Sequence, residues 1–234
     1  MNEAEFDKFA DEYNAMHAAG LAVSGEGPEY FAEYKIKDIL YEYERRPRQV
    51  DSLPLNILDF GAGIGGSVPF VRKYFPSAKL TCIDLSQRSL ELAEKRFPTQ
   101  ASYVHFNGIQ IPFPTDHFDI AYAMCVFHHI DHAEHIALFD ELRRVLRPGG
   151  SLFVFEHNPL NPLTVSVVNA CPFDENAHLI RGSTMKQRLE IAGFNSVKIQ
   201  HRIFFPHALR VFRPLEMVLK WLPLGGQYYA LSHK

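Results

Sequence analysis

A regular alternation of strand-like and helix-like segments, which begins near Leu53, constrains the fold of this chain more than any other feature. The strand-like segments are short apolar runs of the kind found in strands buried on both faces. The expected strands span residues 55–60, 79–84, 102–107, 118–126 and 151–156, and the expected helices span residues 67–74, 86–97 and 133–146. Because strands that alternate with helices run parallel with right-handed crossovers, this order predicts a doubly wound α/β sheet.

The two ends of the chain depart from this alternation. Helices are expected at 3–17 and 30–44, where glycines and Pro28 separate two helical patterns. After the alternating region we expect a helix at 183–192, a strand at 196–205, a helix at 207–222 and a final strand at 227–233. The last two strands can pair as an antiparallel addition to the sheet, with the helix inserted between them.

The strongest local motif is Asp59-Phe60-Gly61-Ala62-Gly63-Ile64-Gly65-Gly66, which lies between the first strand and its helix. Glycines allow close approach of the backbone to a ligand, and the N-terminus of the following helix adds N–H donors. Asp84 ends the second strand about 23 residues after Gly61, where its carboxylate can accept hydrogen bonds from both hydroxyls of a ribose. The combination predicts a nucleotide-binding site; the alternative is a tight turn in which Asp84 only caps the next helix.

The glycine spacing leaves the class of nucleotide open. Gly61, Gly63 and Gly66 also fit the G-x-G-x-x-G pattern of dinucleotide-binding enzymes. Three features favour a nucleoside that carries an amino acid moiety. Asp59, just before the first glycine, suits a cationic group, and Gly65 adds a further alternate glycine. The chain also ends with the expected antiparallel pair instead of a second mononucleotide-binding half.

At these residues the chain resembles the class I S-adenosylmethionine-dependent methyltransferases, in particular the small-molecule group with a type 11 methyltransferase domain. The resemblance extends from about Leu53 to Gly193, and its motifs lie at 58–65, 84–85, 107–113, 116–119, 127–130 and 144–150. It implies a Rossmann-like sheet of seven strands with the last one antiparallel, and S-adenosyl-L-methionine as the cofactor. The cofactor-binding residues that it implies are Asp59, Gly61, Ala62, Gly63, Gly65, Asp84, Leu85, Asn107, Gly108, Ile109, Met124 and His129.

Asn107 departs from the family pattern, in which an Asp usually meets the adenine amino group, although the Asn carbonyl can accept the same hydrogen bond. With the resemblance, we expect a single domain over 1–234. Its parts are an N-terminal helical lid at 1–50, a cofactor-binding core at 53–193 and C-terminal strands with a helical insert at 194–234. Residues 158–182 are a long irregular stretch, which we expect to cover the pocket.

The implied reaction transfers a sulfonium methyl group to an O, N or C atom of a small molecule, with a base where the acceptor carries a proton. His129 and His157 follow the fourth and fifth strands, where ligands of doubly wound sheets bind, and both are candidate catalytic residues. For His129, a structural hydrogen bond at the loop is the favoured alternative. His128, His132 and His135 have spacings compatible with metal ligation, but the last two suit a solvated helix surface, so no metal is expected.

The composition limits which partners and which cellular location we expect for this chain. The chain has 24 Lys and Arg against 27 Asp and Glu, and a net charge of −3 offers no field that attracts nucleic acid. No apolar stretch approaches the roughly 20 residues of a membrane-spanning helix, and the first residues lack a secretory signal. Three widely spaced cysteines fit no disulfide framework. We expect a cytoplasmic protein with a small-molecule substrate, no nucleic-acid partner and no integral membrane segment.

Other interpretations remain open at this point. The basic and aromatic helix expected at 207–222 can contact a membrane or an apolar substrate, pack on the sheet, or form a homodimer contact. An NAD(P)-dependent oxidoreductase and a non-catalytic cofactor-binding protein also fit the glycine motif. A methyltransferase for protein or RNA would need a basic or extended groove, which the composition does not suggest.

Overall fold

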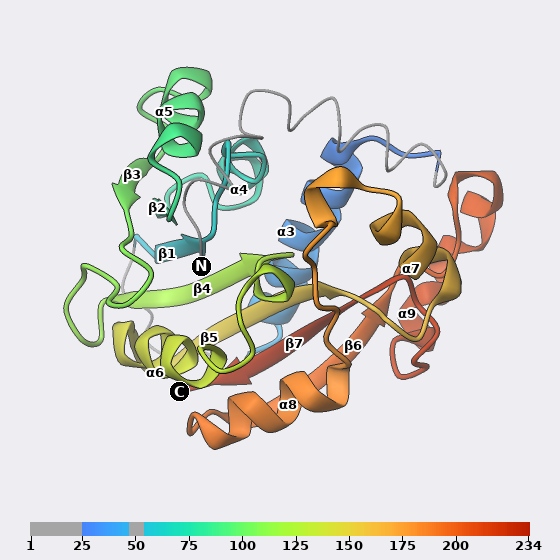
Figure 1. Cartoon of the computed structure of the whole chain (residues 1–234). Coiled ribbons are helices and arrows are strands. Elements are labelled where there is room, and N and C mark those ends of the chain that lie inside the picture. The colour runs from blue at the N-terminus through green and yellow to red at the C-terminus, as the bar shows by residue number, and fades with distance from the viewer. Residues whose placement is uncertain (1–24, 47–53) are drawn as a thin grey trace.

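The computed structural model describes residues 25–46 and 54–234, which form a seven-stranded sheet in the order β3-β2-β1-β4-β5-β7-β6 (Figure 1). The strands are β1 (Asn56–Phe60), β2 (Lys79–Asp84), β3 (Ser102–His105), β4 (Phe118–Met124), β5 (Leu146–His157), β6 (Asn195–Arg202) and β7 (Gln227–His233). The pairs formed among β1 to β5 are parallel, whereas β7 lies antiparallel to both β5 and β6. The predicted doubly wound sheet with an antiparallel last strand is confirmed.

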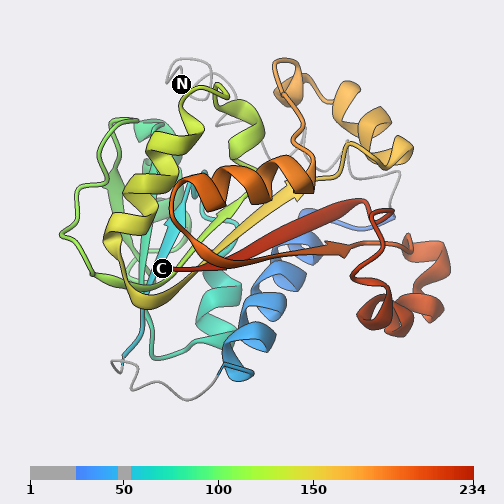
Figure 2. The same cartoon turned by 90° about the horizontal axis from the view of Figure 1, so that it is seen from below.

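Helices cover both faces of this sheet (Figure 2). The helices of the described residues are α3 (Pro28–Glu44), α4 (Val68–Tyr74), α5 (Gln87–Arg96), α6 (His135–Val145), α7 (Pro162–Asn169), α8 (Gly182–Ile191) and α9 (Glu216–Leu219), with 3₁₀ turns η2 (Phe127–His129), η3 (Pro172–Asp174) and η4 (His207–Leu215). Leu138 of α6 and Leu58 of β1 share one buried cluster, while Ile36 of α3 and Ile57 of β1 share another. Ile57 and Leu58 belong to different clusters because successive strand residues point to opposite faces.

Local signals explain where several helices begin. Oγ of Ser86 accepts a hydrogen bond of 3.0 Å from the N–H of Ser89, so the predicted N-cap of α5 is confirmed. Oδ1 of Asn161 accepts one of 3.0 Å from Thr164, and Pro162 opens α7. The prediction that 158–182 is irregular throughout was therefore wrong, since this capping pattern starts a helix within it.

Two further predictions need correction. The single helix expected at 207–222 is instead the 3₁₀ segment η4 followed by the short α9, with Pro214, which has no backbone N–H to donate, inside η4. The fifth strand begins at Leu146, directly after α6, because Leu146 pairs with Phe118 and the Pro148-Gly149-Gly150 segment continues the strand. The expected helix at 3–17 lies outside the described residues.

The segment between β6 and β7 has several solvent-exposed apolar side chains. Val211, Val218 and Trp221 are each about two-thirds to three-quarters exposed, and η4 has no buried residue. The interpretation that the apolar side of η4 packs on the sheet was therefore wrong. Among the described residues, no helix combines the length and apolar character needed to cross a membrane.

Candidate functional site

A cavity of about 390 Å³ lies at the carboxyl ends of β1, β2, β4 and β5. This is the edge at which doubly wound sheets bind ligands. Its lining includes most of the predicted cofactor residues, namely Asp59, Gly61, Ala62, Gly63, Asp84, Leu85, Met124 and His129. The candidate base His157 and residues from the start of α3 line the same space. The topology thus brings the glycine loop and a histidine to one cavity.

The glycine loop after β1 lies against the end of β2 and the segment after β4. Gly61 has a φ of +74°, and its N–H donates to the carbonyl oxygen of Ile83 at 2.9 Å. A Cβ atom on Gly61 would lie 2.6 Å from Cγ2 of Val126. Both the backbone conformation and the close approach therefore require glycine at this position.

Asp84 connects this loop with the predicted ribose position. Its Oδ2 accepts a hydrogen bond of 2.7 Å from the N–H of Gly63, and its Oδ1 accepts one of 2.9 Å from the N–H of Ser86. Burial raises the pKa of the Asp84 carboxyl, while these backbone donors act in the opposite direction. Because each carboxylate oxygen has two lone pairs, ribose hydroxyls can donate to Asp84 without displacing the backbone donors.

Asp59 lies at the end of β1, 2% exposed, beside the same loop. Oγ of Ser67 donates to its Oδ2, and the hydroxyl of Tyr122 donates to the same oxygen at 3.1 Å. Burial raises the pKa of Asp59 to about 7, although these two hydrogen bonds lower it. A cationic group in the cavity would favour the ionised carboxylate, so Asp59 suits the ammonium end of a ligand.

Four of the predicted cofactor residues do not line the cavity, namely Gly65, Asn107, Gly108 and Ile109. Oδ1 of Asn107 accepts hydrogen bonds from the N–H groups of Ile109 and Gln110, at 2.9 and 3.0 Å, and so closes a turn after β3. The side chain of Ile109 is exposed. Contacts of these four residues with a cofactor stay predictions.

A polar cluster from α3, β7 and the ends of β4 and β5 also lines the cavity. Nζ of Lys35 in α3 donates to Sγ of Cys125 at 3.2 Å, and the side chain of His157 forms a hydrogen bond with the same thiol. Burial raises the pKa of Cys125, but Lys35 and the hydrogen bond with His157 outweigh it and bring the pKa to about 6. Nε2 of Gln227 lies 3.4 Å from Nδ1 of His157, and the Tyr34 hydroxyl donates to Oε1 of Gln227. These contacts orient His157 from α3 and β7.

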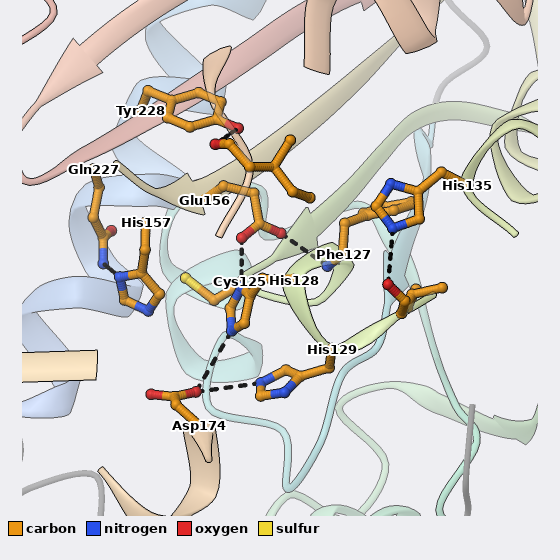
Figure 3. A network of polar contacts seen from close by, with 12 residues as sticks. Cys125, Phe127, His128, His129, His135, Glu156, His157, Asp174, Gln227 and Tyr228 are labelled. Atoms are coloured by element: carbon orange, nitrogen blue, oxygen red, sulfur yellow. Dashed lines mark hydrogen bonds and ion pairs between the residues drawn. The ribbon is translucent and has the colours of Figure 1, made fainter. Parts of the chain in front are cut away.

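A second cluster connects η2 with η3 (Figure 3). Nδ1 of the buried His128 lies 2.5 Å from Oε2 of Glu156, and its Nε2 lies 3.5 Å from Oδ1 of Asp174. Nε2 of His129 lies 3.4 Å from the same Asp174 oxygen. Burial lowers the pKa of His128, but Glu156 and Asp174 outweigh it and raise the pKa to about 10. For His129, burial and the adjacent His128 both lower the pKa, to about 3. His129, which lines the cavity, is therefore neutral near pH 7.

The set His128, His132 and His135 does not assemble as a group of ligands. Nε2 of the buried His135 donates to the carbonyl oxygen of Ile130 at 3.1 Å, and its Nδ1 accepts a hydrogen bond of 2.7 Å from Arg188. Both ring nitrogens of His135 are thus engaged.

Sequence analysis did not single out Gln227, Glu156 or Asp174. It placed Lys35 only within the N-terminal helical lid and counted Cys125 only among the three cysteines. The rule that ligands bind at strand ends could have found Cys125 and Glu156, since Cys125 directly follows β4 and Glu156 is the next-to-last residue of β5. Lys35 and Asp174 come from α3 and η3, which tertiary packing brings to the site, so no local pattern marks them.

Comparisons with known proteins agree with this geometry. Residues 58–154 match the family model described as a methyltransferase domain. A mitochondrial 2-methoxy-6-polyprenyl-1,4-benzoquinol methylase of Caenorhabditis elegans is 28% identical over 124 residues, which cover 50% of this chain and 43% of that protein. A sterol 24-C-methyltransferase of Gibberella zeae is 32% identical over 107 residues, which cover 44% of this chain and 27% of that protein. The chain thus spans less than half the length of these two relatives.

Solved structures share the fold. A methyltransferase of Thermotoga maritima, described as S-adenosylmethionine-dependent and a possible histamine N-methyltransferase, superimposes with a TM-score of 0.68 and 18% identity, and the match covers 99% of both chains. Residues 58–154 are thus similar to a methyltransferase domain, and the chain shares its fold with S-adenosylmethionine-dependent methyltransferases of known structure. The similarity favours this class over the dinucleotide alternative from the glycine spacing. The residues fit the cofactor of this class, because Asp84 can accept from a ribose and Asp59 suits an ammonium group.

Proposed function

We propose that this chain transfers a methyl group from S-adenosylmethionine to an O, N or C atom of a small molecule. One observation carries the proposal: the glycine loop with Asp84 and the imidazole of His157 border a single cavity of about 390 Å³. Methyl transfer needs a bound cofactor and an acceptor held in contact, and a shared cavity allows this proximity.

In this proposal three residues that line the cavity would hold the cofactor. Asp84 accepts the ribose hydroxyls, Leu85 packs against the adenine and Asp59 meets the ammonium group of the methionine part. When bound, the cofactor supplies an electrophilic methyl group on a sulfonium sulfur. The residues of the chain bind and orient it, and the buried carboxyl of Asp59 becomes ionised as the ammonium group approaches.

His157 is the better of the two candidate bases. Its ring is oriented by Gln227 and Cys125, and it lines the cavity at the end of β5. Where the acceptor carries a proton, His157 would take that proton as the acceptor atom bonds to the methyl carbon and the bond between that carbon and the sulfonium sulfur breaks. His129, with a pKa of about 3, is a weaker proton acceptor, so we propose that it shapes the cavity.

The class of acceptor rests on the relatives and on charge. The two curated relatives are named for a quinol and a sterol, which are small molecules. The net charge of −3 favours a small-molecule acceptor over a nucleic acid. A cytoplasmic location and a homodimer stay predictions from the sequence, as does a single domain over 1–234.

The cofactor part of the proposal is tested by calorimetric titration with S-adenosylmethionine, S-adenosylhomocysteine and NADH. We expect saturable binding of the first two and none of NADH. Tight NADH binding, with no binding of S-adenosylmethionine or S-adenosylhomocysteine, would contradict the proposal.

Catalysis needs a separate test, with a labelled methyl group and a panel of phenols, quinols, hydroxylated lipids and amines. We expect label transfer to at least one acceptor, with His157→Gln lowering kcat and leaving cofactor affinity within about twofold. Cofactor binding with no transfer to any acceptor would favour the non-catalytic alternative.

A further inference from the structure

We propose that His128, His129 and Asp174 form a binding site for a divalent transition-metal ion, best suited to four-coordinate Zn²⁺, at the junction of η2 and η3 (Figure 3). The sequence led us to expect no metal, and this proposal departs from that expectation. It also goes beyond the proposed methyl transfer, because it uses none of the residues assigned to the ribose, the ammonium group or proton transfer.

The spacing of three ligand atoms carries the proposal. Both imidazole Nε2 atoms face one oxygen of Asp174, at 3.5 Å from His128 and 3.4 Å from His129, and the three atoms lie within 4.8 Å of one another. N–H···O hydrogen bonds measure about 2.7–3.2 Å, so both separations are long for direct bonds. Around tetrahedral zinc, bonds of about 2.0–2.2 Å put ligand atoms roughly 3.3–3.5 Å apart. The two distances from Nε2 to Oδ1 therefore match the spacing of neighbouring ligand atoms around a tetrahedral zinc ion.

The surroundings of His128 are those of a metal ligand. Its Nδ1 lies 2.5 Å from Oε2 of Glu156, and the other oxygen of Glu156 accepts a hydrogen bond of 2.8 Å from the N–H of Phe127. A carboxylate that holds one imidazole nitrogen leaves the other nitrogen aimed at the ion, and such carboxylate–histidine pairs accompany zinc ligands. Both His128 and Glu156 are buried, which keeps this arrangement rigid.

The position of the site gives the ion a role in the fold of the pocket. Asp174 belongs to the segment between β5 and α8, and the N–H of His178 in that segment already donates to the carbonyl oxygen of His128 at 2.7 Å. A bound ion would also link this segment to η2 through the side chains of Asp174, His128 and His129. Three protein ligands leave a fourth coordination position for water or for an oxygen of a substrate, and His129 borders the cavity.

A purely ionic arrangement is the competing explanation. An imidazolium at His128 between Glu156 and Asp174 balances part of the buried charge without a metal. It does not require the second Nε2, from His129, to approach the same Asp174 oxygen. It also predicts no stoichiometric uptake of Zn²⁺, so a binding experiment separates the two explanations.

The test is a titration of the metal-stripped full chain with ZnCl₂, followed by calorimetry, and with CoCl₂, followed by visible absorption. We expect one ion per chain and the intense bands of four-coordinate Co²⁺. The isosteric variant Asp174→Asn should bind Zn²⁺ at least about 100-fold more weakly, and Glu156→Gln about 10–100-fold more weakly. His132→Asn, a change at an exposed neighbouring histidine, is the matched control and should retain full affinity.

Four results would overturn the site: no stoichiometric uptake by the wild type, a six-coordinate Co²⁺ spectrum, equal affinity in Asp174→Asn, or loss of affinity in His132→Asn. The first two are measured on the wild type and do not depend on any variant folding. S-Adenosylhomocysteine titration of Asp174→Asn should give unchanged affinity. Failure of the metal site is thereby distinguishable from failure of the proposed methyl transfer.

Discussion

Oδ2 of Asp84 accepts a hydrogen bond of 2.7 Å from the backbone N–H of Gly63. This contact joins the carboxyl end of β2 to the glycine loop after β1. The acid and the loop therefore form one unit, and a ligand that contacts Asp84 also lies beside the loop backbone. Changes at either partner should affect cofactor binding, which the following predictions exploit.

Replacing Asp84 with Ala removes the charged acceptor for the ribose hydroxyls. We expect the Kd for S-adenosylhomocysteine to rise at least tenfold, which corresponds to about 1.4 kcal/mol. Calorimetry measures the change, and Glu91→Gln on the exposed side of α5 serves as a control with unchanged Kd. An unaltered Kd in Asp84→Ala would show that the ribose lies elsewhere.

The requirement for glycine at position 61 predicts a stability difference between two neighbouring glycines. In Gly61→Ala the new Cβ meets Val126 at 2.6 Å with φ at +74°, and we expect a loss of about 1–3 kcal/mol in the free energy of unfolding. Nothing lies within 4 Å of the Cβ position of Gly66, so Gly66→Ala should change stability by less than about 1 kcal/mol. Chemical denaturation without ligand compares them, and equal losses would contradict the explanation.

The raised pKa of Asp59 predicts a pH dependence of cofactor binding. Between the ordinary value of 3.8 and about 7, folded protein without ligand holds a proton that the unfolded chain has lost, so this group makes stability fall as pH rises through that window. An ammonium group favours the ionised carboxylate, so S-adenosylhomocysteine affinity should rise from about pH 5 to about pH 7 with release of a proton.

The control for this pH dependence is Asp59→Asn, which keeps the size of the side chain and cannot ionise. Its affinity should be lower at pH 7 and nearly independent of pH over the same range. A wild-type affinity that is flat between these values would contradict the proposed contact between Asp59 and the ammonium group.

The environment of Cys125 predicts a reactive thiol in the cavity. With a pKa of about 6, Cys125 should react with iodoacetamide at half its maximal rate near that pH, because the thiolate is the nucleophile. Lys35→Ala removes the nearest ammonium and should move the midpoint upward. Burial raises the pKa of Cys82, so mass spectrometry should find that residue unmodified. A midpoint near 9 would contradict the Lys35 contact.

The sequence predicted the parts of the fold and site that depend on local patterns. Asp59, Gly61 and Asp84 lie at the ends of two apolar strands, and strand order alone brings such ends to one edge of a parallel sheet. The N-cap at Ser86 is equally local, because its oxygen accepts from a residue three positions later.

Other features depend on contacts between distant segments, and no local pattern reports them. Lys35 reaches Cys125 because α3 packs across the sheet, a contact between residues 90 positions apart. Asp174 meets His128 through the packing of η3 on η2. The helix α7 was missed for a different reason. Pro159, Pro162 and Pro172 give the 158–182 stretch an irregular pattern, but Asn161-Pro162 is a cap followed by a first-turn proline.

The central claim is that the cavity holds S-adenosylmethionine with its methyl group toward His157. A crystal structure with bound S-adenosylhomocysteine tests it most directly. The account predicts both ribose hydroxyls within hydrogen-bond distance of Asp84, the ammonium group beside Asp59 and the sulfur facing the His157 end of the cavity. A ligand bound outside the cavity, or one whose ribose does not contact Asp84, would contradict it.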